Sequence, residues 1–343
     1  MVDALCMELV LRKQELTDRI ETVYLGGGTP SLLTVGQLDQ LFNCIAQHYD
    51  LAEEIEFTLE ANPDDISEDL LLGYKAIGVN RLSLGIQSFR EADLKFMNRA
   101  HDSRQANEAL SLVLKHFDNF SVDLIYGIPE LSKIDWLSNL KNAIDAGVPH
   151  LSCYALTVEP GTALDRFIAK GVVAPVDEDL AKAHYDQLLA YTAEQGFENY
   201  EFSNFGKPGY ESKNNTAYWE GVPYLGIGPG AHSLVGNTRS WNVRSNPKYI
   251  KELQAGVRPF ESEQLTINDR FNEYIMTGLR TAKGVSLDKI EADFGAIYKN
   301  HVEQLIPQLQ ARQWIFLDGD RIHIPKASKF LSDGIAAELF KLL

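Results

Sequence analysis

The sequence contains no uninterrupted apolar run of about 18 residues, the length that a membrane-spanning helix requires. Its first residues mix charges among the apolar positions, so they lack the continuous core of a signal peptide. Only three cysteines are present, Cys6, Cys44 and Cys153, and their number and spacing give no disulfide framework. Such cysteine usage is typical of reduced thiols, so we expect a cytoplasmic protein.

Basic residues are also scarce. Lysine and arginine total 32 against 48 aspartate and glutamate residues, which gives a formal net charge of −16. A chain of this charge lacks the basic stripe that releases counterions from nucleic acid, and it is repelled by anionic lipid surfaces. Hydrophobic residues make up 45% of the 343 residues, which is ordinary globular usage, and the length suggests two domains.

Short β-rich runs alternate with helical patterns over the first two thirds of the chain. The runs cover residues 22–28, 54–62, 81–89, 121–129, 150–156 and 198–205. The helical patterns between them begin at residues suited to N-caps or first turns, namely Thr34, Ser67, Ser103 and Asp177. This alternation predicts an α/β fold with a parallel sheet and right-handed crossovers.

Such a sheet can stay open and doubly wound or close into a barrel. Polar residues lie at the ends of five successive runs: Thr29, Glu60, Gln87, Asp123 and Tyr154. In a barrel the carboxyl ends of the strands converge on one mouth, whereas an open sheet spreads them along an edge. We therefore favour a barrel or partial barrel.

The organisation changes after about residue 235. Residues 269–280 have a helical pattern, and a later helix is followed by two short β runs that meet at Asp318-Gly319, a hairpin signal. The sequence therefore predicts a first domain over residues 1–235 and a small, mainly helical, winged-helix-like domain over 236–343. DNA binding, the usual function of such a domain, is disfavoured by the net negative charge.

The most specific local motif is Val23-Tyr24-Leu25-Gly26-Gly27-Gly28-Thr29-Pro30, in which three glycines end the first β run. Three glycines expose the backbone, so its N–H and C=O groups can approach a phosphate, a carboxylate or an ammonium group. The pattern matches neither of the common nucleotide-binding glycine motifs. The alternative is a tight turn without a ligand.

Four polar residues belong to the later part of this pattern: Glu60, Gln87 and Asp123 lie within β runs, and Arg99 follows the run over residues 81–89. Singly, a glutamate at a strand end is more often an ion-pair partner than a ligand-binding group. Together they offer two carboxylates, an amide and a guanidinium, which suit a zwitterionic ligand that carries a sugar. A cofactor-independent lyase or aldolase with Glu60 and Asp123 as acid and base is disfavoured, because no Lys or His lies at a strand end.

Six motifs in series resemble one family: GGGTPSLL, LEANPD, GVNRLSLGIQSF, VDLIYGIP, LSCYALTVEPGTAL and YLGIGPGAHS. They are similar to the radical S-adenosylmethionine proteins related to oxygen-independent coproporphyrinogen III oxidase (HemN-like), and most similar to the HemW-type haem chaperones. The resemblance implies a partial (β/α)6 barrel and the family's C-terminal domain. It also implies that S-adenosylmethionine is bound by Gly27, Gly28, Thr29, Glu60, Gln87, Arg99 and Asp123.

The sequence departs from this family at its N-terminus. The family holds a [4Fe–4S] cluster with a CxxxCxxC triad, and the cluster reduces S-adenosylmethionine to a radical. This sequence has no such triad, so we predict no catalytic or metal-ligating residue and no radical chemistry for the chain as given. Residue 1 corresponds to a family position after the triad. We therefore interpret the sequence as truncated, without the first strand and the cluster loop; the alternative is a cluster-free relative.

A second departure concerns haem. Residues 212–219 resemble the HNxxYW motif of the haem chaperones, but Asn214 occupies the histidine position. An amide is a poor axial ligand, so Tyr218 and Trp219 are predicted porphyrin contacts and His232 an alternative iron ligand, although all three suit ordinary packing.

The predicted function is haem delivery to haem-accepting proteins, with an electron donor serving the cluster in an intact form. The alternative is oxidative decarboxylation of coproporphyrinogen III in porphyrin biosynthesis. Homodimer formation stays open.

Overall fold

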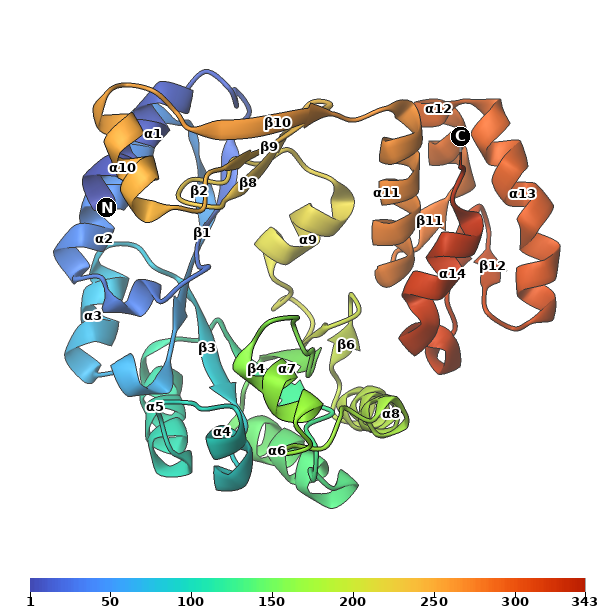
Figure 1. Cartoon of the computed structure of the whole chain (residues 1–343), viewed down its shortest axis with the longest axis horizontal. Helices are drawn as coiled ribbons and strands as arrows, with labels where there is room; N and C mark the ends of the chain where they lie inside the picture. Colours follow the sequence, from blue (N-terminus) through green and yellow to red (C-terminus); the bar gives the residue numbers. More distant parts are fainter. Residues whose placement is uncertain (343) are drawn as a thin grey trace. The chain divides into compact units, whose positions relative to one another are not determined.

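The computed structural model describes residues 1–342 (Figure 1). The chain divides into two compact units, each assembled from separated segments. The first unit contains residues 1–23, 33–56 and the chain from 213 onward, and the second contains residues 24–32 and 57–212. The predicted domains, 1–235 and 236–343, are continuous segments of the chain and do not coincide with these units. The domain boundary at residue 235 therefore stays a prediction.

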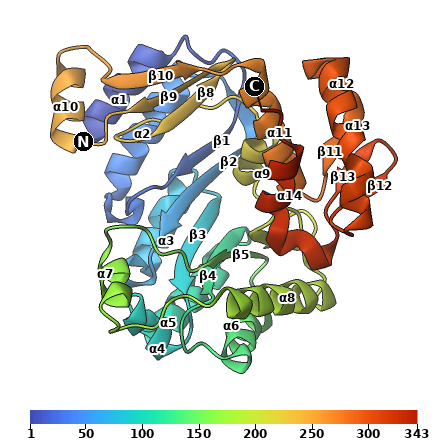
Figure 2. The same cartoon turned by 45° about the vertical axis from the view of Figure 1, so that its right-hand side comes forward.

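A seven-stranded sheet has the order β1-β2-β3-β4-β5-β7-β6. Its first five strands are β1 (Ile20–Leu25), β2 (Leu51–Ala61), β3 (Arg81–Gln87), β4 (Phe120–Tyr126) and β5 (His150–Ala155). Strands β2 to β5 run parallel, and Figure 2 shows β3, β4 and β5 side by side in chain order. The predicted α/β class with a parallel sheet is confirmed for these strands.

The sixth predicted strand, over residues 198–205, is wrong. The structure has two short strands there, β6 (Glu198–Asn199) and β7 (Asn204–Gly206), which pair antiparallel, and β7 also pairs antiparallel with β5. A turn between them reverses the chain: the Asn204 N–H donates to the Glu201 carbonyl at 3.3 Å. The Glu201 carboxylate also accepts the Ser203 N–H at 3.2 Å. Because the turn contains no glycine or proline, the sequence pattern does not show that the β-rich run is interrupted there.

Helices cover one face of the parallel strands. They are α3 (Glu68–Ala76), α4 (Glu91–Phe96), α5 (Ser103–His116), α6 (Lys133–Ala146) and α8 (Glu178–Glu194), with a 3-10 turn at Pro63–Asp65. The short helix α7 (Ala163–Ala169) follows β5 and has no buried residue. The predicted caps Ser67 and Asp177 are confirmed, whereas α5 is capped by Asp102, one residue before the predicted start.

Residues alternate between the two faces of β3 and β4. Leu82, Leu84, Phe120, Val122 and Leu124 are buried, and Ser83, Ser121 and Asp123 lie between them along the strands. The Ser121 hydroxyl donates to the Ser83 hydroxyl at 3.0 Å, so the three polar side chains share the other face of the sheet. This polar face carries the candidate site.

The first unit begins with α1 (Val2–Arg12) and α2 (Val35–His48), and α2 has the predicted Thr34 cap. The 3-10 turn at Pro30–Leu32 belongs to the second unit. The first unit continues with α9 (Lys213–Glu220), α10 (Asn246–Gln254) and an antiparallel sheet of β8 (His232–Val235), β9 (Thr238–Asn242) and β10 (Phe260–Gln264). This sheet was not predicted, although Gly236-Asn237 between β8 and β9 is a two-residue hairpin signal. Strand β10 is exposed throughout and carries no apolar alternation.

The C-terminal part of the first unit contains α11 (Ile267–Arg280), α12 (Leu287–Phe294), α13 (Ala296–Ala311), a 3-10 turn (Lys326–Leu331) and α14 (Ser332–Leu339). A small sheet joins β11 (Val285–Ser286), β12 (Phe316–Asp318) and β13 (Arg321–His323). The predicted hairpin at Asp318-Gly319 is confirmed, since β12 and β13 pair antiparallel around it. One apolar core, which includes Phe271, Ile275 and Val302, holds these elements together.

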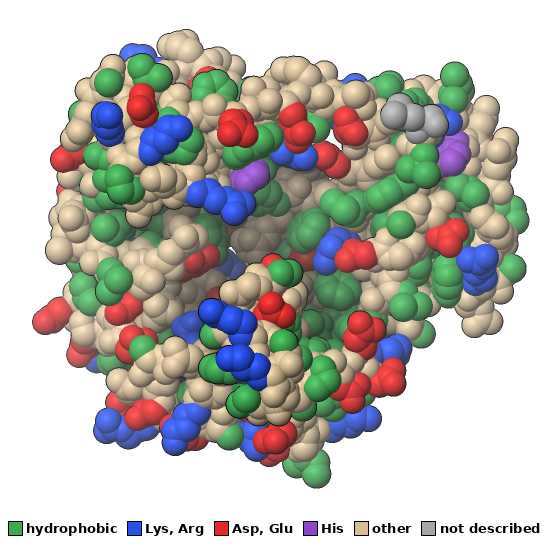
Figure 3. All heavy atoms as spheres, viewed as in Figure 1, with side chains coloured by type: hydrophobic (Ala, Val, Ile, Leu, Met, Phe, Trp, Pro, Cys, Tyr) green, Lys and Arg blue, Asp and Glu red, His purple; other side chains and the backbone are tan. Residues whose placement is uncertain are grey.

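Within residues 1–342, no helix combines the length and the apolar character needed to cross a membrane. On the face shown in Figure 3, the described Lys and Arg side chains are interspersed with Asp and Glu and do not merge into a broad basic surface. That mixed surface agrees with the net charge of −16.

Candidate cofactor-binding site

A polar pocket lies at the carboxyl ends of β2, β3 and β4, within the second unit. Six of the seven predicted cofactor residues line it: Gly28, Thr29, Glu60, Gln87, Arg99 and Asp123. Pro30, Ser31, Ala61, Asn62, Ser83 and Gly85 complete its lining. The seventh predicted residue, Gly27, donates its N–H to Glu60. The structure therefore brings the predicted set together, and the role of the set stays a prediction.

Glu60 holds a fixed place in this pocket because both carboxylate oxygens accept hydrogen bonds. The Tyr24 hydroxyl donates to Oε1 at 2.7 Å, and the Gly27 N–H donates to Oε2 at 3.1 Å. Tyr24 belongs to the glycine motif, but the sequence predicts no role for it, since a tyrosine at a strand end also fits ordinary β propensity.

Arg99 and Gln87 lie around Gly85. The Arg99 Nη2 donates to Asn62 Oδ1 at 2.7 Å and to the Gly85 carbonyl at 3.3 Å. Its Nε is buried and has no hydrogen-bond partner among the described residues, so the guanidinium can still bind a ligand carboxylate. Gln87 has a φ of +67°, an uncommon conformation for a non-glycine residue, at an irregularity in the β3–β4 register. Such outliers concentrate at functional sites.

Asp123 accepts hydrogen bonds from the Ser83 hydroxyl at 3.2 and 3.4 Å. Burial, followed by the nearby charge of Glu60, raises the pKa of Asp123 to about 7. Near neutral pH the carboxyl group can therefore either donate or accept a hydrogen bond, which suits a ligand hydroxyl.

The raised pKa of Asp123 makes the stability of the chain pH-dependent. Its folded-state pKa of about 7 lies above the ordinary value of 3.8, so the folded state binds the extra proton between these values. Relative to Asp123→Asn, we expect the wild type to lose on the order of a few kcal/mol of unfolding free energy as pH rises from about 4 to about 7. Chemical denaturation at several pH values measures this difference.

The matched control for this prediction is Asp118→Asn, which alters an exposed aspartate just before β4. The difference between wild type and Asp118→Asn should stay almost constant over the same pH range. Equal pH dependence of the wild type and Asp123→Asn would contradict the prediction.

The predicted haem residues lie in the first unit. Tyr218 is 49% exposed, and its ring centroid lies 4.5 Å from that of Tyr224. The Arg280 guanidinium lies 5.4 Å from the Trp219 ring centroid. His232 is exposed at the start of β8, where its ring stacks on Trp241 at 5.8 Å. An exposed imidazole is a suitable iron ligand.

Asn214, at the position of the family histidine, takes part in the start of α9. Its Oδ1 accepts a hydrogen bond from the Thr22 hydroxyl at 3.2 Å. The buried Glu56 carboxylate accepts the N–H groups of Lys213 and Asn214, both at 3.0 Å, and so caps the helix. These contacts give Asn214 a structural role and do not supply an iron ligand.

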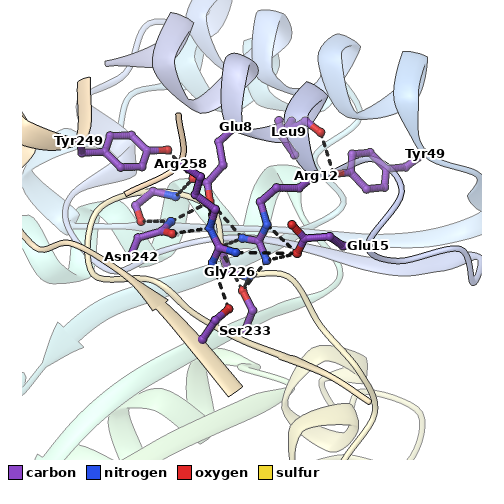
Figure 4. Close-up of polar contacts among 12 residues, drawn as sticks. Glu8, Leu9, Arg12, Glu15, Tyr49, Gly226, Ser233, Asn242, Tyr249 and Arg258 are labelled. Carbon is purple, nitrogen blue, oxygen red and sulfur yellow. Dashed lines mark hydrogen bonds and ion pairs between the residues drawn. The ribbon is translucent and has the colours of Figure 1, made fainter. Parts of the chain in front are cut away.

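A buried polar network connects α1 with the segment that precedes His232 (Figure 4). Glu8 accepts hydrogen bonds from Arg12 at 3.0 Å, the Gly228 N–H at 2.9 Å and Asn242 at 2.7 Å. Arg12 in turn donates to the Gly226 carbonyl at 2.8 Å. The network thus fixes the backbone of residues 226–228, and sequence reasoning missed it.

The described residues suit S-adenosylmethionine but not an iron–sulfur cluster. The pocket offers carboxylates, a guanidinium with an unused buried nitrogen, and bare glycine backbone, which fit the amino, carboxylate and ribose groups of S-adenosylmethionine. A [4Fe–4S] cluster does not fit, since residues 1–342 contain no group of three or more His, Cys, Asp or Glu side chains that could hold a metal ion.

Two family models match the chain: the radical SAM superfamily over residues 6–141 and the HemN C-terminal domain over residues 265–331. The heme chaperone HemW of Lactococcus lactis is 33% identical over 94% of this chain and 86% of its own length. The heme chaperone HemW of Mycobacterium tuberculosis (strain H37Rv) is 34% identical over 98% of this chain and 85% of its own.

Among solved structures, coproporphyrinogen III oxidase from Escherichia coli, a radical SAM enzyme, aligns with a TM-score of 0.83. The alignment covers 99% of this chain and 82% of the oxidase at 22% identity, which shows a shared fold. The predicted fold class is therefore confirmed, and the two sequence relatives define the family more narrowly. The chain belongs to the HemW family of the radical SAM superfamily.

Proposed function

We propose that this chain binds S-adenosylmethionine in the pocket of the second unit and carries haem for delivery to haem-accepting proteins. The observation that carries the first part is the grouping of Glu60, Gln87, Arg99 and Asp123 around one pocket. Relatives that are named heme chaperones support the second part. Three free cysteines support a reducing, cytoplasmic location.

Each pocket residue has a distinct part in this proposal. The fixed Glu60 carboxylate attracts the ligand's positive charge, and the Arg99 guanidinium, which lines the pocket, pairs with its carboxylate. Asp123 exchanges hydrogen bonds with the ribose hydroxyls. The glycine backbone at residues 27–28 contacts the methionyl part, because no side chain intervenes there.

Haem binding is tested by adding haem to the purified chain. We expect the Soret band to shift as haem binds. His232→Ala should lower the haem affinity by about tenfold, since loss of an axial ligand removes a strong bond to iron. His48→Ala, which removes an imidazole from α2, is the matched control. The absence of any Soret shift in the wild type would refute haem binding, and equal affinities of wild type and His232→Ala would refute the ligand.

Oxidative decarboxylation of coproporphyrinogen III is the second candidate. The structural similarity to the oxidase supports a common fold and carries no argument for its substrate. Porphyrinogen turnover by the protein would favour this candidate over haem delivery.

A further inference from the structure

Tyr24 lies at the end of β1, directly before the three glycines, and its side chain reaches Glu60. The hydroxyl donates to Glu60 Oε1 at 2.7 Å. Burial, followed by the charge of Glu60, raises the pKa of the Tyr24 phenol far above the physiological range. The hydroxyl therefore remains a neutral donor under all working conditions of the protein.

The second oxygen of Glu60 is used at the same time. Oε2 accepts the Gly27 N–H at 3.1 Å, and Gly27 has a φ of +78°, the left-handed region that favours glycine. One carboxylate thus links the end of β1 to the glycine segment. Because Glu60 also lines the pocket, its orientation affects both the segment and the pocket surface.

The ring of Tyr24 fits closely against Gly26. A Cβ atom on Gly26 would lie 2.5 Å from Tyr24 Cε1 and 2.5 Å from Glu60 Oε1. Any other residue at position 26 would therefore force the Tyr24 ring and the Glu60 carboxylate to move. Gly26, Tyr24 and Glu60 therefore pack as one group. The Tyr24 ring packs against Gly26, and the Tyr24 hydroxyl orients the Glu60 carboxylate through a hydrogen bond.

We propose that Tyr24 is a positioning residue, whose hydroxyl holds the Glu60 carboxylate against the Gly27 amide and so orders residues 26–29 for the ligand. The proposal rests on the proposed S-adenosylmethionine site. Without the hydroxyl, the Gly27 N–H is the one hydrogen-bond donor to Glu60 that remains among the described residues, and the carboxylate can turn away from the pocket. Hydrogen bonds to an ionised acceptor are about twice as strong as neutral ones, so we expect ligand binding to weaken by about tenfold.

Tyr24→Phe tests the proposal, because it keeps the ring against Gly26 and removes only the donor. Tyr74→Phe is the matched control: Tyr74 is fully buried in α3, and its hydroxyl has no hydrogen-bond partner among the described residues. Titration with S-adenosylmethionine should give about tenfold weaker binding for Tyr24→Phe and wild-type affinity for Tyr74→Phe. Thermal unfolding of each variant checks that the fold is retained.

A double-mutant cycle separates positioning from a general structural role. In the Glu60→Ala background, Tyr24→Phe should weaken binding no further, because the carboxylate that it holds is gone. Amide hydrogen exchange of residues 24–30, measured by mass spectrometry without ligand, should be faster in Tyr24→Phe than in wild type or Tyr74→Phe. Wild-type exchange in Tyr24→Phe, or fully additive effects in the cycle, would overturn the proposal.

The exchange measurement also distinguishes two failures. If the wild type bound no S-adenosylmethionine, the proposed function would fail, and faster exchange in Tyr24→Phe would still support the role of Tyr24. If the wild type bound the ligand and Tyr24→Phe matched it in affinity and exchange, only the positioning role would fail.

Discussion

Replacing Glu8 by alanine is expected to lower the free energy of unfolding by about 3–5 kcal/mol, the usual cost of removing one partner of a buried ion pair. Glu8 is fully buried, and its side chain lies 3.0 Å from Arg12, which is also buried (Figure 4). Besides Arg12, Asn242 and the Gly228 amide, the Tyr249 hydroxyl donates to it at 2.5 Å. The substitution leaves these donors unsatisfied and the Arg12 charge without its buried partner.

Glu15→Ala is the matched control, since Glu15 is the other carboxylate bound to Arg12, at 2.8 Å, and is 40% exposed. Partly exposed ion pairs contribute little, so we expect a loss of at most about 1 kcal/mol. Urea denaturation of both variants measures the difference. Equal losses would mean that the buried network does not hold α1 to residues 226–242.

Substituting Gly26 by alanine is expected to weaken S-adenosylmethionine binding by about a hundredfold. The new Cβ would lie 2.5 Å from both Tyr24 Cε1 and Glu60 Oε1, so the ring and the carboxylate must move. Overpacking of this kind costs about 1–3 kcal/mol, and here the strain falls on a residue that lines the pocket. Calorimetric titration measures the affinity.

Gly36→Ala is the control for Gly26→Ala. Gly36 lies in α2, and a Cβ there meets no atom within 4 Å. We expect wild-type affinity and a slight gain in stability from the higher helix propensity of alanine. Retained affinity in Gly26→Ala would contradict the packing described for Tyr24, Gly26 and Glu60.

The sequence allowed the pocket to be predicted because parallel strands place their carboxyl ends together. Glu60 and Asp123 lie 63 residues apart, yet they belong to β2 and β4 of one parallel sheet, and the pocket contains both. The role of Tyr24 could not be predicted, because it depends on the distance from the Tyr24 hydroxyl to Glu60, which no local sequence pattern encodes.

Glu8 was not predictable either, since its partners lie far along the chain and a glutamate in an amphipathic helix is normally solvated. The contact between Glu8 and Tyr249 spans 241 residues. The strand after Glu201 was predicted to continue the parallel sheet, and this prediction was wrong for a related reason. A turn supported by the Glu201 side chain reverses the chain within the β-rich run. Periodicity predicts elements well, whereas contacts that fix buried polar groups depend on the finished fold.

The most direct measurement is a calorimetric titration of the wild-type chain and Glu60→Gln with S-adenosylmethionine, carried to millimolar ligand. The wild type should bind one molecule per chain, and Glu60→Gln should bind at least about tenfold more weakly, since the ligand's positive charge loses its carboxylate partner. No binding by the wild type, or equal affinity of the two proteins, would contradict the assignment of the pocket.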